Sequence, residues 1–450
     1  MSNIVVTNWF GDLLSHPHIV VQARSVNDIV TVMKDPATYP SPVRAVGSNH
    51  STSPCGVADG GTLIQMKMNQ ILNLGTDTLT VEAGAIHIDL AQQLEQSKKQ
   101  FYVNTEIGSL SAGSAACAGT KDASMPGEYG QVGSYIIGAK LVLPSGDLLE
   151  VTEEKQPELM QQLRSSYGTF GIIYEVSYRI RPLLPMAVYH KTFSIDDFAT
   201  ELPDLIALNQ SMMFYIFPFE DKITIEFRKY NPDAAGEPNR CAWALRNHTW
   251  GTSGPKFGHD VEETIPDPAI RYGVIDNFNG LWRFQLETFV KGDYTIPGDQ
   301  IIRYPPVSND SRYTFSLFAF PEQDYPNALK DFCKFCRDYY QQKGYRSNLL
   351  CVGYRIAKDQ QALLSYSYHG TVMTIDPVST GNPGWTDFLL AYNQFCSDRN
   401  GLPLLNQTFG ITPAIAKKSF GDRLQTLADT RRTYDPNNRL MNDYFKGLLT

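Results

Sequence analysis

The stretch RAVGSNHSTSPCG, residues 44 to 56, reads as a β-strand that stops at Gly47 and passes into a run of small polar residues. The neighbours of His50 in this run are Ser48, Asn49 and Ser51. Two structures fit the pattern. One is a solvated loop; the other is a tight turn whose backbone N–H groups converge on an anion, since glycine, serine and asparagine tolerate the conformations that such a turn requires. The remainder of the sequence has to decide between them.

A second stretch, IGSLSAGSAACAGTKDAS at residues 107 to 124, is almost free of large side chains. A buried run of glycine, alanine and serine lets the backbone lie close against a neighbour, whereas a flexible linker is unusual in the middle of a domain. We therefore expect ligand contact, and the two stretches together could hold an extended, phosphate-bearing cofactor. The candidate cofactor-binding residues of the second stretch are Gly108, Ser109, Gly113, Ser114, Cys117, Gly119 and Thr120.

Competing motifs are missing from the sequence. It has no G-x-x-x-x-G-K-[ST] run, and no G-x-G-x-x-G joins a strand to a helix in the first half, which disfavours P-loop and Rossmann folds. Cys333 and Cys336 form a lone C-x-x-C without a second pair at zinc spacing, so we interpret them as core or surface cysteines and expect no metal site.

Composition narrows the class of protein. A chain of 450 residues with 42% hydrophobic content predicts two or three folded domains. Its net charge is −8 and it has no basic run, so we expect no nucleic-acid partner. We find neither an export signal nor roughly 18 consecutive apolar residues, and seven scattered cysteines favour reduced thiols. These features predict a cytoplasmic protein without a membrane partner; the oligomeric state stays open.

The pattern of elements changes along the chain. Residues 19–181 alternate strands and helices and end in the half-buried strand GIIYEVSYRIRP at 171–182. Beyond Pro185 the aromatic content rises with the alternation of antiparallel strands, which predicts a second α+β domain. Within it, the turn-rich segment 239–268 is interpreted as a long surface or lid-like excursion. The predicted domains are 1–183, 184–405 and a C-terminal segment at 406–450.

Four motifs occur in the order seen in one flavoprotein family: VRAVGSNHS, GSLSAGSAACAGT, GIIYEVSYRIRP and the tail YDPNNRLMNDYF. With them, the chain resembles the vanillyl-alcohol-oxidase-type (PCMH-type) FAD-binding oxidoreductases, and within these the aldonolactone and alditol oxidase branch. The resemblance implies an α+β fold, in which a two-subdomain FAD-binding domain precedes an α+β cap domain with an antiparallel sheet. It also implies that the C-terminal segment returns to the flavin site.

The resemblance assigns roles to particular residues. Gly47, Ser48, Asn49 and Ser51 would bind the pyrophosphate, and His50 takes the position of the histidine that the family joins covalently to the flavin 8α-methyl group. The small residues of the second stretch would line the opposite side of the cofactor. Ile173 would contact the adenine end through its backbone, and Asn442 and Tyr444 would close over the flavin. A second covalent link through Cys55 or Cys117 is an alternative that their positions disfavour.

Three departures from the family pattern concern the chemistry. The Glu-x-Arg pair of the cap keeps Arg355 but has Gly353 at the acidic position; the His-Trp-Gly-Lys signature falls on NQTFGIT; and Thr-His-Gly reads Thr120-Lys121-Asp122. The candidate catalytic residues are then Arg355, Asp376 and, on an expected strand, Tyr368 and His369; ordinary structural roles are the alternative for all four.

The resemblance implies that a substrate C–H bearing a hydroxyl or amine gives a hydride to flavin N5, while a general base removes the proton. Burial could raise the pKa of Asp376 for that task, and dioxygen is the expected electron acceptor. The substrate is a sugar-derived polyol or lactone, or alternatively a specialised-metabolite intermediate that is dehydrogenated or cyclised. A non-catalytic protein that binds flavin or another ligand is the further alternative.

Overall fold

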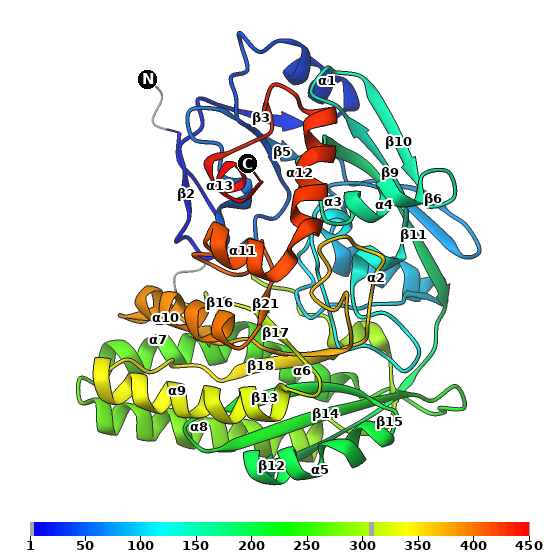
Figure 1. The fold of residues 1–450 in the computed structure, drawn as a ribbon. Helices are drawn as coiled ribbons and strands as arrows, with labels where there is room; N and C mark the ends of the chain where they lie inside the picture. Colours follow the sequence, from blue (N-terminus) through cyan, green and yellow to red (C-terminus); the bar gives the residue numbers. More distant parts are fainter. Residues whose placement is uncertain (1–3, 306–309, 450) are drawn as a thin grey trace.

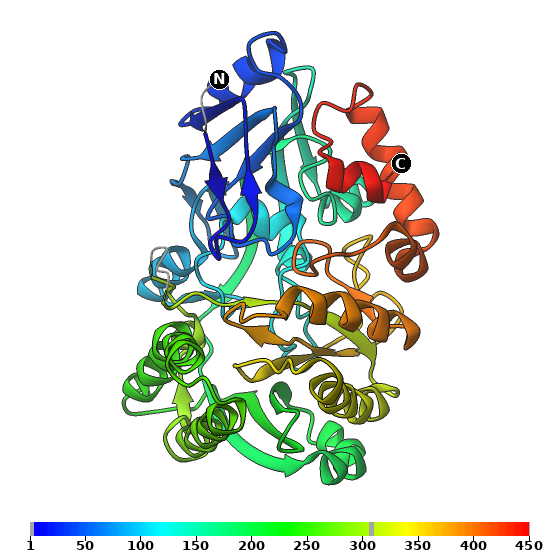
Figure 2. The same ribbon diagram turned by 90° about the vertical axis from the view of Figure 1, so that its left-hand side faces the viewer.

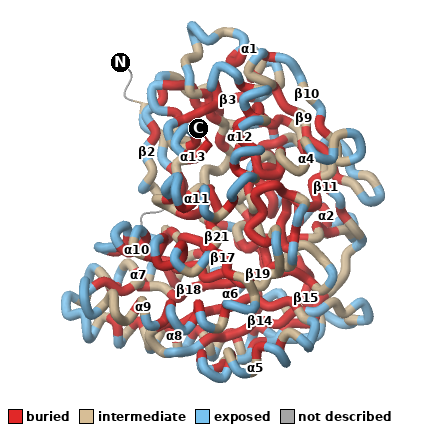
Figure 3. Tube along the Cα trace, in the orientation of Figure 1, coloured by how far each residue is buried: buried red, intermediate tan, exposed pale blue. Residues whose placement is uncertain are grey.

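The computed structural model describes residues 4–305 and 310–449, which form two stacked lobes. Residues 1–3 and 450, the outer ends of two predicted domains, and residues 306–309 lie outside the described part of the chain. Figure 1 shows the first and last described segments of the chain on the upper lobe, and Figure 2 shows the long helices of the middle of the chain gathered on the lower one. Buried residues follow the strands through both lobes, whereas the outer faces of the helices are exposed (Figure 3).

The upper lobe contains two sheets. The first is parallel, in the order β3-β5-β4, and the second is antiparallel, in the order β10-β9-β11-β7-β6, with β8 paired to the end of β11. The strands of the first sheet are β3 (Ile19–Ala23), β4 (Val43–Val46) and β5 (Thr62–Met66). Those of the second are β6 (Ile71–Leu74), β7 (Thr78–Glu82), β8 (Lys99–Phe101), β9 (Ile136–Val142), β10 (Leu148–Thr152) and β11 (Ile172–Pro182). The helices of this lobe are α1 (Val26–Lys34), α2 (His87–Gln96), α3 (Ala112–Cys117) and α4 (Pro157–Leu163), and a small β1–β2 pair (Val6–Thr7 with Leu14–Ser15) precedes them.

Local sequence explains these elements. The hydroxyl of Ser25 accepts a hydrogen bond from the backbone of Asp28, and the Asp28 carboxylate accepts one from the backbone of Ser25, so a capping box starts α1. Val176 and Tyr178 of β11 are buried while Arg179 is exposed, in agreement with the alternation that predicted this strand. The hairpin of β9 and β10 turns at Pro-Ser-Gly-Asp, residues 144–147, a sequence typical of turns.

The lower lobe is built on an antiparallel sheet in the order β15-β12-β14-β13-β18-β19-β17-β21. Its strands are β12 (Met186–Ser194), β13 (Ser211–Phe217), β14 (Lys222–Tyr230), β15 (Gly292–Thr295), β17 (Phe318–Pro321), β18 (Cys351–Ile356), β19 (Val372–Ile375) and β21 (Leu402–Pro403), and a separate pair joins β16 (Thr314–Phe315) to β20 (Val378–Ser379). The α+β fold with an antiparallel sheet in its second half is therefore confirmed.

Both faces of this sheet are covered, because alternate residues of β13 meet different helices. Phe214 packs against Phe198 of α5 and Tyr325 of α9, whereas Tyr215 packs against Trp282 of α8 on the opposite face. The helices of this lobe are α5 (Ile195–Ala207), α6 (Arg240–His248), α7 (Gly254–Thr264), α8 (Pro268–Phe289), α9 (Tyr325–Lys343) and α10 (Trp385–Asp398). All residues of β13 are buried as a result.

The predicted surface excursion at 239–268 is wrong. This segment folds as α6, a π-helical turn at Thr249–Ser253 and α7, and it packs on the sheet through Trp243 and Arg246. Its Gly-Pro sequence lies where the π-helical turn passes into α7, and the N–H of Gly254 still donates to the carbonyl of Thr249. The turn-forming residues therefore fall within a continuous helical segment and not in a loop.

The C-terminal segment crosses back to the upper lobe (Figure 1). It consists of α11 (Pro413–Phe420), α12 (Asp422–Tyr434) and α13 (Asp443–Leu449). The backbone N–H of Val43 donates to the carbonyl of Arg439, and the side chain of Asn442 donates to the carbonyls of Pro54 and Val57. The segment thus braces the strand and loop that contain the first quoted stretch. The domain boundaries at 183/184 and 405/406 stay a prediction.

Candidate functional site

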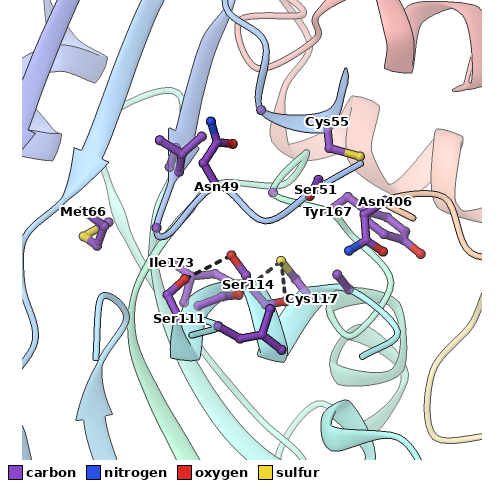
Figure 4. A pocket seen from close by; sticks show the side chains of 18 of the residues that line it. Asn49, Ser51, Cys55, Met66, Ser111, Ser114, Cys117, Tyr167, Ile173 and Asn406 are labelled. Carbon is purple, nitrogen blue, oxygen red and sulfur yellow. Dashed lines mark hydrogen bonds between the residues drawn. The ribbon is translucent and has the colours of Figure 1, made fainter. Parts of the chain in front are cut away.

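A cleft of about 1000 Å³ separates the loop after β4 from helix α3. Figure 4 shows Asn49 and Ser51 on the loop and Ser114 and Cys117 on the helix facing it. The predicted cofactor residues that line this cleft are Gly47, Ser48, Asn49, His50, Ser51, Gly113, Ser114, Cys117, Thr120 and Ile173. The two stretches singled out in the sequence therefore meet across one cavity.

The loop offers backbone donors to this cleft. Among the described residues, no protein acceptor is found for the N–H groups of residues 48–51, whereas the N–H of Thr52 donates to the carbonyl of Asn406. Asn49 has a φ of 57°, in the left-handed region that asparagine tolerates, and its side chain donates to the carbonyl of Thr7. Consecutive N–H groups without acceptors in a turn form an anion-binding concavity. The left-handed Asn49 and the unpaired donors favour the tight turn over a solvated loop, and anion binding by this turn stays a prediction.

Two glycines let the walls of the cleft approach each other. A Cβ atom on Gly47 would lie 2.1 Å from Oγ of Ser111, and one on Gly113 would lie 3.0 Å from Cβ of Ala83. Real Cβ atoms do not approach an oxygen so closely, so Gly47 can have no side chain unless Ser111 moves. The small residues of both stretches are thus required by the backbone packing around the cleft.

His50 is held as a neutral imidazole at the edge of the cleft. Its ring stacks on the indole of Trp9, with 4.8 Å between ring centres and an angle of 17°, and the Tyr304 ring lies 5.8 Å away. Burial lowers the pKa of His50 to about 4. The backbone N–H of Trp9 donates to the carbonyl of Asn49, which fixes the stacking residue to the same loop. A neutral imidazole keeps one ring nitrogen with a free lone pair.

Several predicted cofactor residues lie outside the cleft. Gly108 packs against Ile301 and Ile302, and Gly119 packs against Leu404 and Tyr366. Ser109 belongs to the turn that begins at Gly108 and does not line the cleft. Asn442 and Tyr444 do not line it either: Asn442 binds the 54–57 loop, and the Tyr444 hydroxyl donates to the carbonyl of Leu405. Their contacts support the walls of the cleft from behind.

The two cysteines of the cleft are protonated thiols. Burial raises the pKa of Cys55 to about 12 and that of Cys117 to about 11. The Cys117 thiol donates to the carbonyl of Gly113 at 3.3 Å within α3. A thiol in this state is a poor nucleophile, since the thiolate is the reactive form.

A second cavity, of about 520 Å³, adjoins the cleft on the side of the lower lobe. The two share Leu110, Thr120 and Gln407. The remaining lining residues of the second cavity are Thr105, Glu106, Ile107, Lys121, Trp250, Tyr304, Tyr313, Phe315, Val352, Tyr354, Asp376 and Val378. It thus lies between the cleft and the sheet of the lower lobe.

A buried ion pair lies in the wall of this second cavity. Nζ of Lys121 is 2.9 Å from Oδ2 of Asp376, and the side chains are 7% and 2% exposed. Nζ also lies 4.0 Å from the centre of the Tyr354 ring, a cation–π contact. Oδ1 of Asp376 has no hydrogen-bond partner within the described part of the chain. Burial raises the pKa of Asp376, and Lys121 opposes that shift.

Glu106 is fully engaged by neighbouring side chains. One of its carboxylate oxygens accepts from Arg246, and the other accepts from the hydroxyl of Tyr354 at 2.6 Å. Arg246 also donates to the hydroxyl of Tyr215 at 2.8 Å. This arrangement satisfies a buried carboxylate and a buried guanidinium together, which each of them requires.

Arg355 lies outside both cavities, contrary to its predicted place in the site. It belongs to β18, where side chains alternate between the two faces; Val352 and Tyr354 face the second cavity and Arg355 faces away. Its guanidinium pairs with the carboxylate of Glu322 instead. A Cβ atom on Gly353 would lie 2.2 Å from the carbonyl oxygen of Thr374, so the backbone leaves no room for an acidic side chain there.

Tyr368 and His369 are also away from both cavities. They lie in a series of turns and not on the expected strand. Tyr368 lies under the guanidinium of Arg423 at 4.3 Å, and His369 is exposed. Of the four predicted catalytic residues, the structure brings only Asp376 into the second cavity, where it directly follows β19.

The sequence reasoning missed Glu106, Lys121, Arg246 and Trp250. Lys121 stands directly after Thr120 in the second quoted stretch, and Glu106 stands directly before that stretch, so their proximity to the cleft could have been inferred from these neighbours. Arg246 and Trp250 come from the segment that was interpreted as a surface excursion, and nothing local to them indicated a cavity. Among the described residues, no helix has the length and apolar character needed to cross a bilayer.

Comparison with known proteins bears on the upper lobe first. Residues 17–152 match the family described as FAD binding domain. Over 445 residues the chain is 20% identical to the L-gulono-1,4-lactone dehydrogenase of Mycobacterium tuberculosis (strain ATCC 25618 / H37Rv), covering 98% of each chain. It is 26% identical over 275 residues to the D-arabinono-1,4-lactone oxidase of Eremothecium gossypii, covering 58% of this chain and 48% of that protein.

Solved structures share the whole fold. Cholesterol oxidase from Brevibacterium sterolicum superposes with a TM-score of 0.78 at 13% identity, covering 99% of this chain and 96% of that one. The 6-hydroxy-D-nicotine oxidase of Arthrobacter nicotinovorans has a TM-score of 0.64 at 15% identity, covering 99% and 97%. These matches confirm the predicted resemblance, the FAD-binding domain and the PCMH-type fold.

Proposed function

We propose that this FAD-dependent oxidoreductase oxidises a C–H bond next to a hydroxyl group of a small molecule held in the second cavity, with FAD in the adjoining cleft. The observation that carries the proposal is the adjacency of the two spaces: one has backbone donors without acceptors, and the other has a buried carboxylate with a free oxygen. When bound, FAD supplies the hydride acceptor.

The residues of the cleft fit this cofactor. The N–H groups of residues 48–51 would hold the pyrophosphate, because these residues line the cleft and their N–H groups have no protein partner in the described part of the chain. Gly47 and Gly113 would let the backbone lie against the cofactor, and Ile173 lines the part of the cleft formed by β11. We further propose that His50 is the covalent attachment point. Its neutral ring, fixed by Trp9, supports this role, since a protonated imidazole has no lone pair to form the bond.

In the second cavity, we assign proton removal to Asp376. Its Oδ1 is free to accept the hydrogen of a substrate hydroxyl, and a carboxylate with a raised pKa is a stronger base than a solvated one. Lys121 would keep the carboxylate ionised and would stabilise the oxygen from which the proton leaves. The enclosing side chains would exclude water from this exchange.

The electron acceptor and the substrate class are proposed from the relatives. The relatives include both a lactone dehydrogenase and lactone oxidases, and we propose dioxygen as the acceptor. Sugar lactones and polyols are the substrates that these relatives suggest, and a less polar specialised metabolite is the alternative. A cytoplasmic location and the domain division at residues 183/184 and 405/406 are part of the same proposal.

The test is anaerobic reduction of the bound flavin. Purified holoprotein is mixed without oxygen with sugar lactones, polyols and apolar alcohols, and the loss of the oxidised flavin absorbance is followed. We expect saturable reduction by at least one class and recovery of the colour on admission of air. Recovery of the flavin colour only after a quinone is added would show that a quinone, and not dioxygen, is the electron acceptor. Flavin that dithionite reduces but that no alcohol reduces would support the non-catalytic alternative.

A further inference from the structure

The lining of the second cavity points to a narrower substrate class, an inference that rests on the proposed function. We propose that the substrate is a flat, largely apolar alcohol with its one reacting hydroxyl at the Lys121–Asp376 pair, and that sugar lactones are poor substrates. Specificity would then reside in the aromatic rings of the wall, Trp250 and Phe315 above all.

Most of the cavity wall is apolar. Five of its side chains carry aromatic rings, and four more are aliphatic. The rings are Trp250, Tyr304, Tyr313, Phe315 and Tyr354, and the aliphatic residues are Ile107, Leu110, Val352 and Val378. Trp250 and Phe315 both pack against Tyr313, with ring centres 5.8 and 6.3 Å from it. Such a surface binds flat apolar groups by contact area and offers few hydrogen bonds.

Several polar groups in the cavity wall already have hydrogen-bond partners within the protein. The hydroxyls of Tyr304 and Tyr313 bond to each other, which leaves a single hydroxyl hydrogen between them for a ligand. Both carboxylate oxygens of Glu106 are engaged, by Arg246 and by Tyr354. The hydroxyl of Thr105 donates to the carbonyl of Ile107.

The polar groups that stay available lie at one end. Asp376 has its free Oδ1, and Lys121 has donors beyond the one that it gives to Asp376. Thr120 and Gln407 line both cavities, so they mark the border with the cofactor cleft. The polar end of the second cavity is therefore the end where oxidation would take place.

The apolar end continues into the lower lobe. A third cavity, of about 370 Å³, shares Trp250, Tyr313 and Val378 with the second. Its other walls combine apolar side chains with three polar ones, Thr249, Asn279 and Asn348. Trp250 stands in the π-helical turn 249–253, an irregularity that is frequent at functional sites. A ring placed away from the reacting hydroxyl would thus lie against Trp250, Tyr313 and Val378, the residues that the two cavities share.

A sugar lactone fits this distribution badly. It has a hydroxyl or ring oxygen on almost every carbon, and most of these would face the rings without a partner. Each buried polar group that loses its hydrogen bonds to water without replacement weakens binding by roughly tenfold. An alcohol with one hydroxyl avoids these losses, because its single polar group meets Lys121 and Asp376.

The experiment compares ligands of graded polarity on the holoprotein. Benzyl alcohol, cinnamyl alcohol and 2-naphthalenemethanol are titrated beside L-gulono-1,4-lactone, and both the shift of the flavin spectrum on binding and the anaerobic reduction rate are recorded. We expect dissociation constants to fall by about threefold or more along the aromatic series, as apolar area is added. The lactone should bind at least about tenfold more weakly than cinnamyl alcohol.

Trp250→Ser and its matched control Trp250→Phe locate the specificity. The serine variant should bind cinnamyl alcohol about tenfold or more weakly than the wild type. The phenylalanine variant keeps an aromatic face, and its dissociation constant should stay within about threefold of the wild-type value. Unchanged flavin content in both variants shows that the fold is intact.

The outcomes separate the two proposals. Aromatic alcohols that shift the flavin spectrum saturably but do not reduce the flavin would uphold the substrate chemistry and contradict the oxidation. Reduction by the lactone with no saturable binding of any aromatic alcohol would overturn the inference while the proposed oxidation stands. An aromatic series whose affinity does not rise with ring size would overturn it as well.

Discussion

The two adjoining cavities differ in how the chain builds them. The cofactor cleft is lined by a few continuous stretches, chiefly 44–51 and 110–120, and it uses backbone groups and small residues. The second cavity takes single side chains from segments far apart in the sequence, such as Glu106, Trp250 and Asp376. A site made of backbone leaves a local sequence pattern, because glycine and serine are needed in a row; a site made of converging side chains leaves none.

The largest effect is expected in the second cavity. Asp376→Asn keeps the shape of the side chain and removes the base, so flavin reduction should slow by about 100- to 10,000-fold while flavin content is unchanged. Stopped-flow reduction under anaerobic conditions measures this. A rate loss of less than about tenfold would mean that the second cavity binds the substrate but does not supply the catalytic base.

Lys121→Met tests the Lys121–Asp376 pair through the pH dependence of flavin reduction. Removal of the cation next to Asp376 should raise the pKa of that carboxylate further, so that it is protonated over a wider range. The acid limb of the reduction rate should therefore move to higher pH. Lys121→Arg, which keeps the charge, is the control and should shift the limb less. An unmoved limb would contradict the assignment of Asp376 as the base.

In the upper lobe, His87→Phe should change acid stability. Both ring nitrogens of His87 are buried without a partner among the described residues, and burial lowers its pKa to about 4 from the ordinary value of 6.5. Between these two values the unfolded chain binds more protons, so the folded state loses up to about 3 kcal/mol as the pH falls. Phenylalanine, which can keep the stacking on Phe101, removes that loss.

Chemical unfolding at pH 7 and pH 4.5 measures the His87 effect. The variant should match the wild type within about 1 kcal/mol at pH 7 and should exceed it at pH 4.5. His369→Gln, at an exposed position, should leave both values unchanged. Equal acid sensitivity of wild type and His87→Phe would show that the histidine is not linked to folding.

A smaller effect is expected for Gly47→Ala in the cleft. The new Cβ would lie 2.1 Å from Oγ of Ser111, and the wall has to move, so flavin affinity should fall by about tenfold. The double variant Gly47→Ala/Ser111→Gly removes the obstructing side chain and should recover most of the affinity. Flavin content after purification and titration of FAD into the apoprotein are the readouts. Failure of the double variant to recover would place the defect elsewhere than in this contact.

The smallest effect is expected for Arg355→Gln. Arg355 pairs with Glu322 outside both cavities, and a partly exposed ion pair contributes about 0 to 1 kcal/mol to stability. Flavin reduction should therefore stay within about twofold of the wild type. A strong loss of activity would indicate that Arg355 takes part in the site and would contradict its placement on the face of β18 that points away from the second cavity.

Sequence could predict the elements whose signals are local. The capping box of α1, the alternation of β11 and the helix α9 all follow from patterns within a single element. The cleft residues of the first quoted stretch were found for the same reason.

Errors arose where the outcome depends on distant contacts. Arg355 was placed in the site through the Glu-x-Arg pair, but which face of β18 meets the cavity is set by the strands and lobe packed around it. Trp250 was missed because its segment has the composition of a loop and becomes helical by packing on the lower sheet. Asp376 was found as a buried acid, yet its partner Lys121 is 255 residues away in the chain.

The most direct test of the central claim is acid precipitation of the purified yellow protein. If FAD occupies the cleft and is attached through His50, the colour should stay with the precipitated wild type and appear in the supernatant for His50→Ala. His369→Ala, with its exposed histidine, is the matched control and should behave as the wild type. Release of all flavin from the wild type would contradict the attachment, and a wild type purified without flavin that also fails to bind added FAD would contradict the assignment of the cleft.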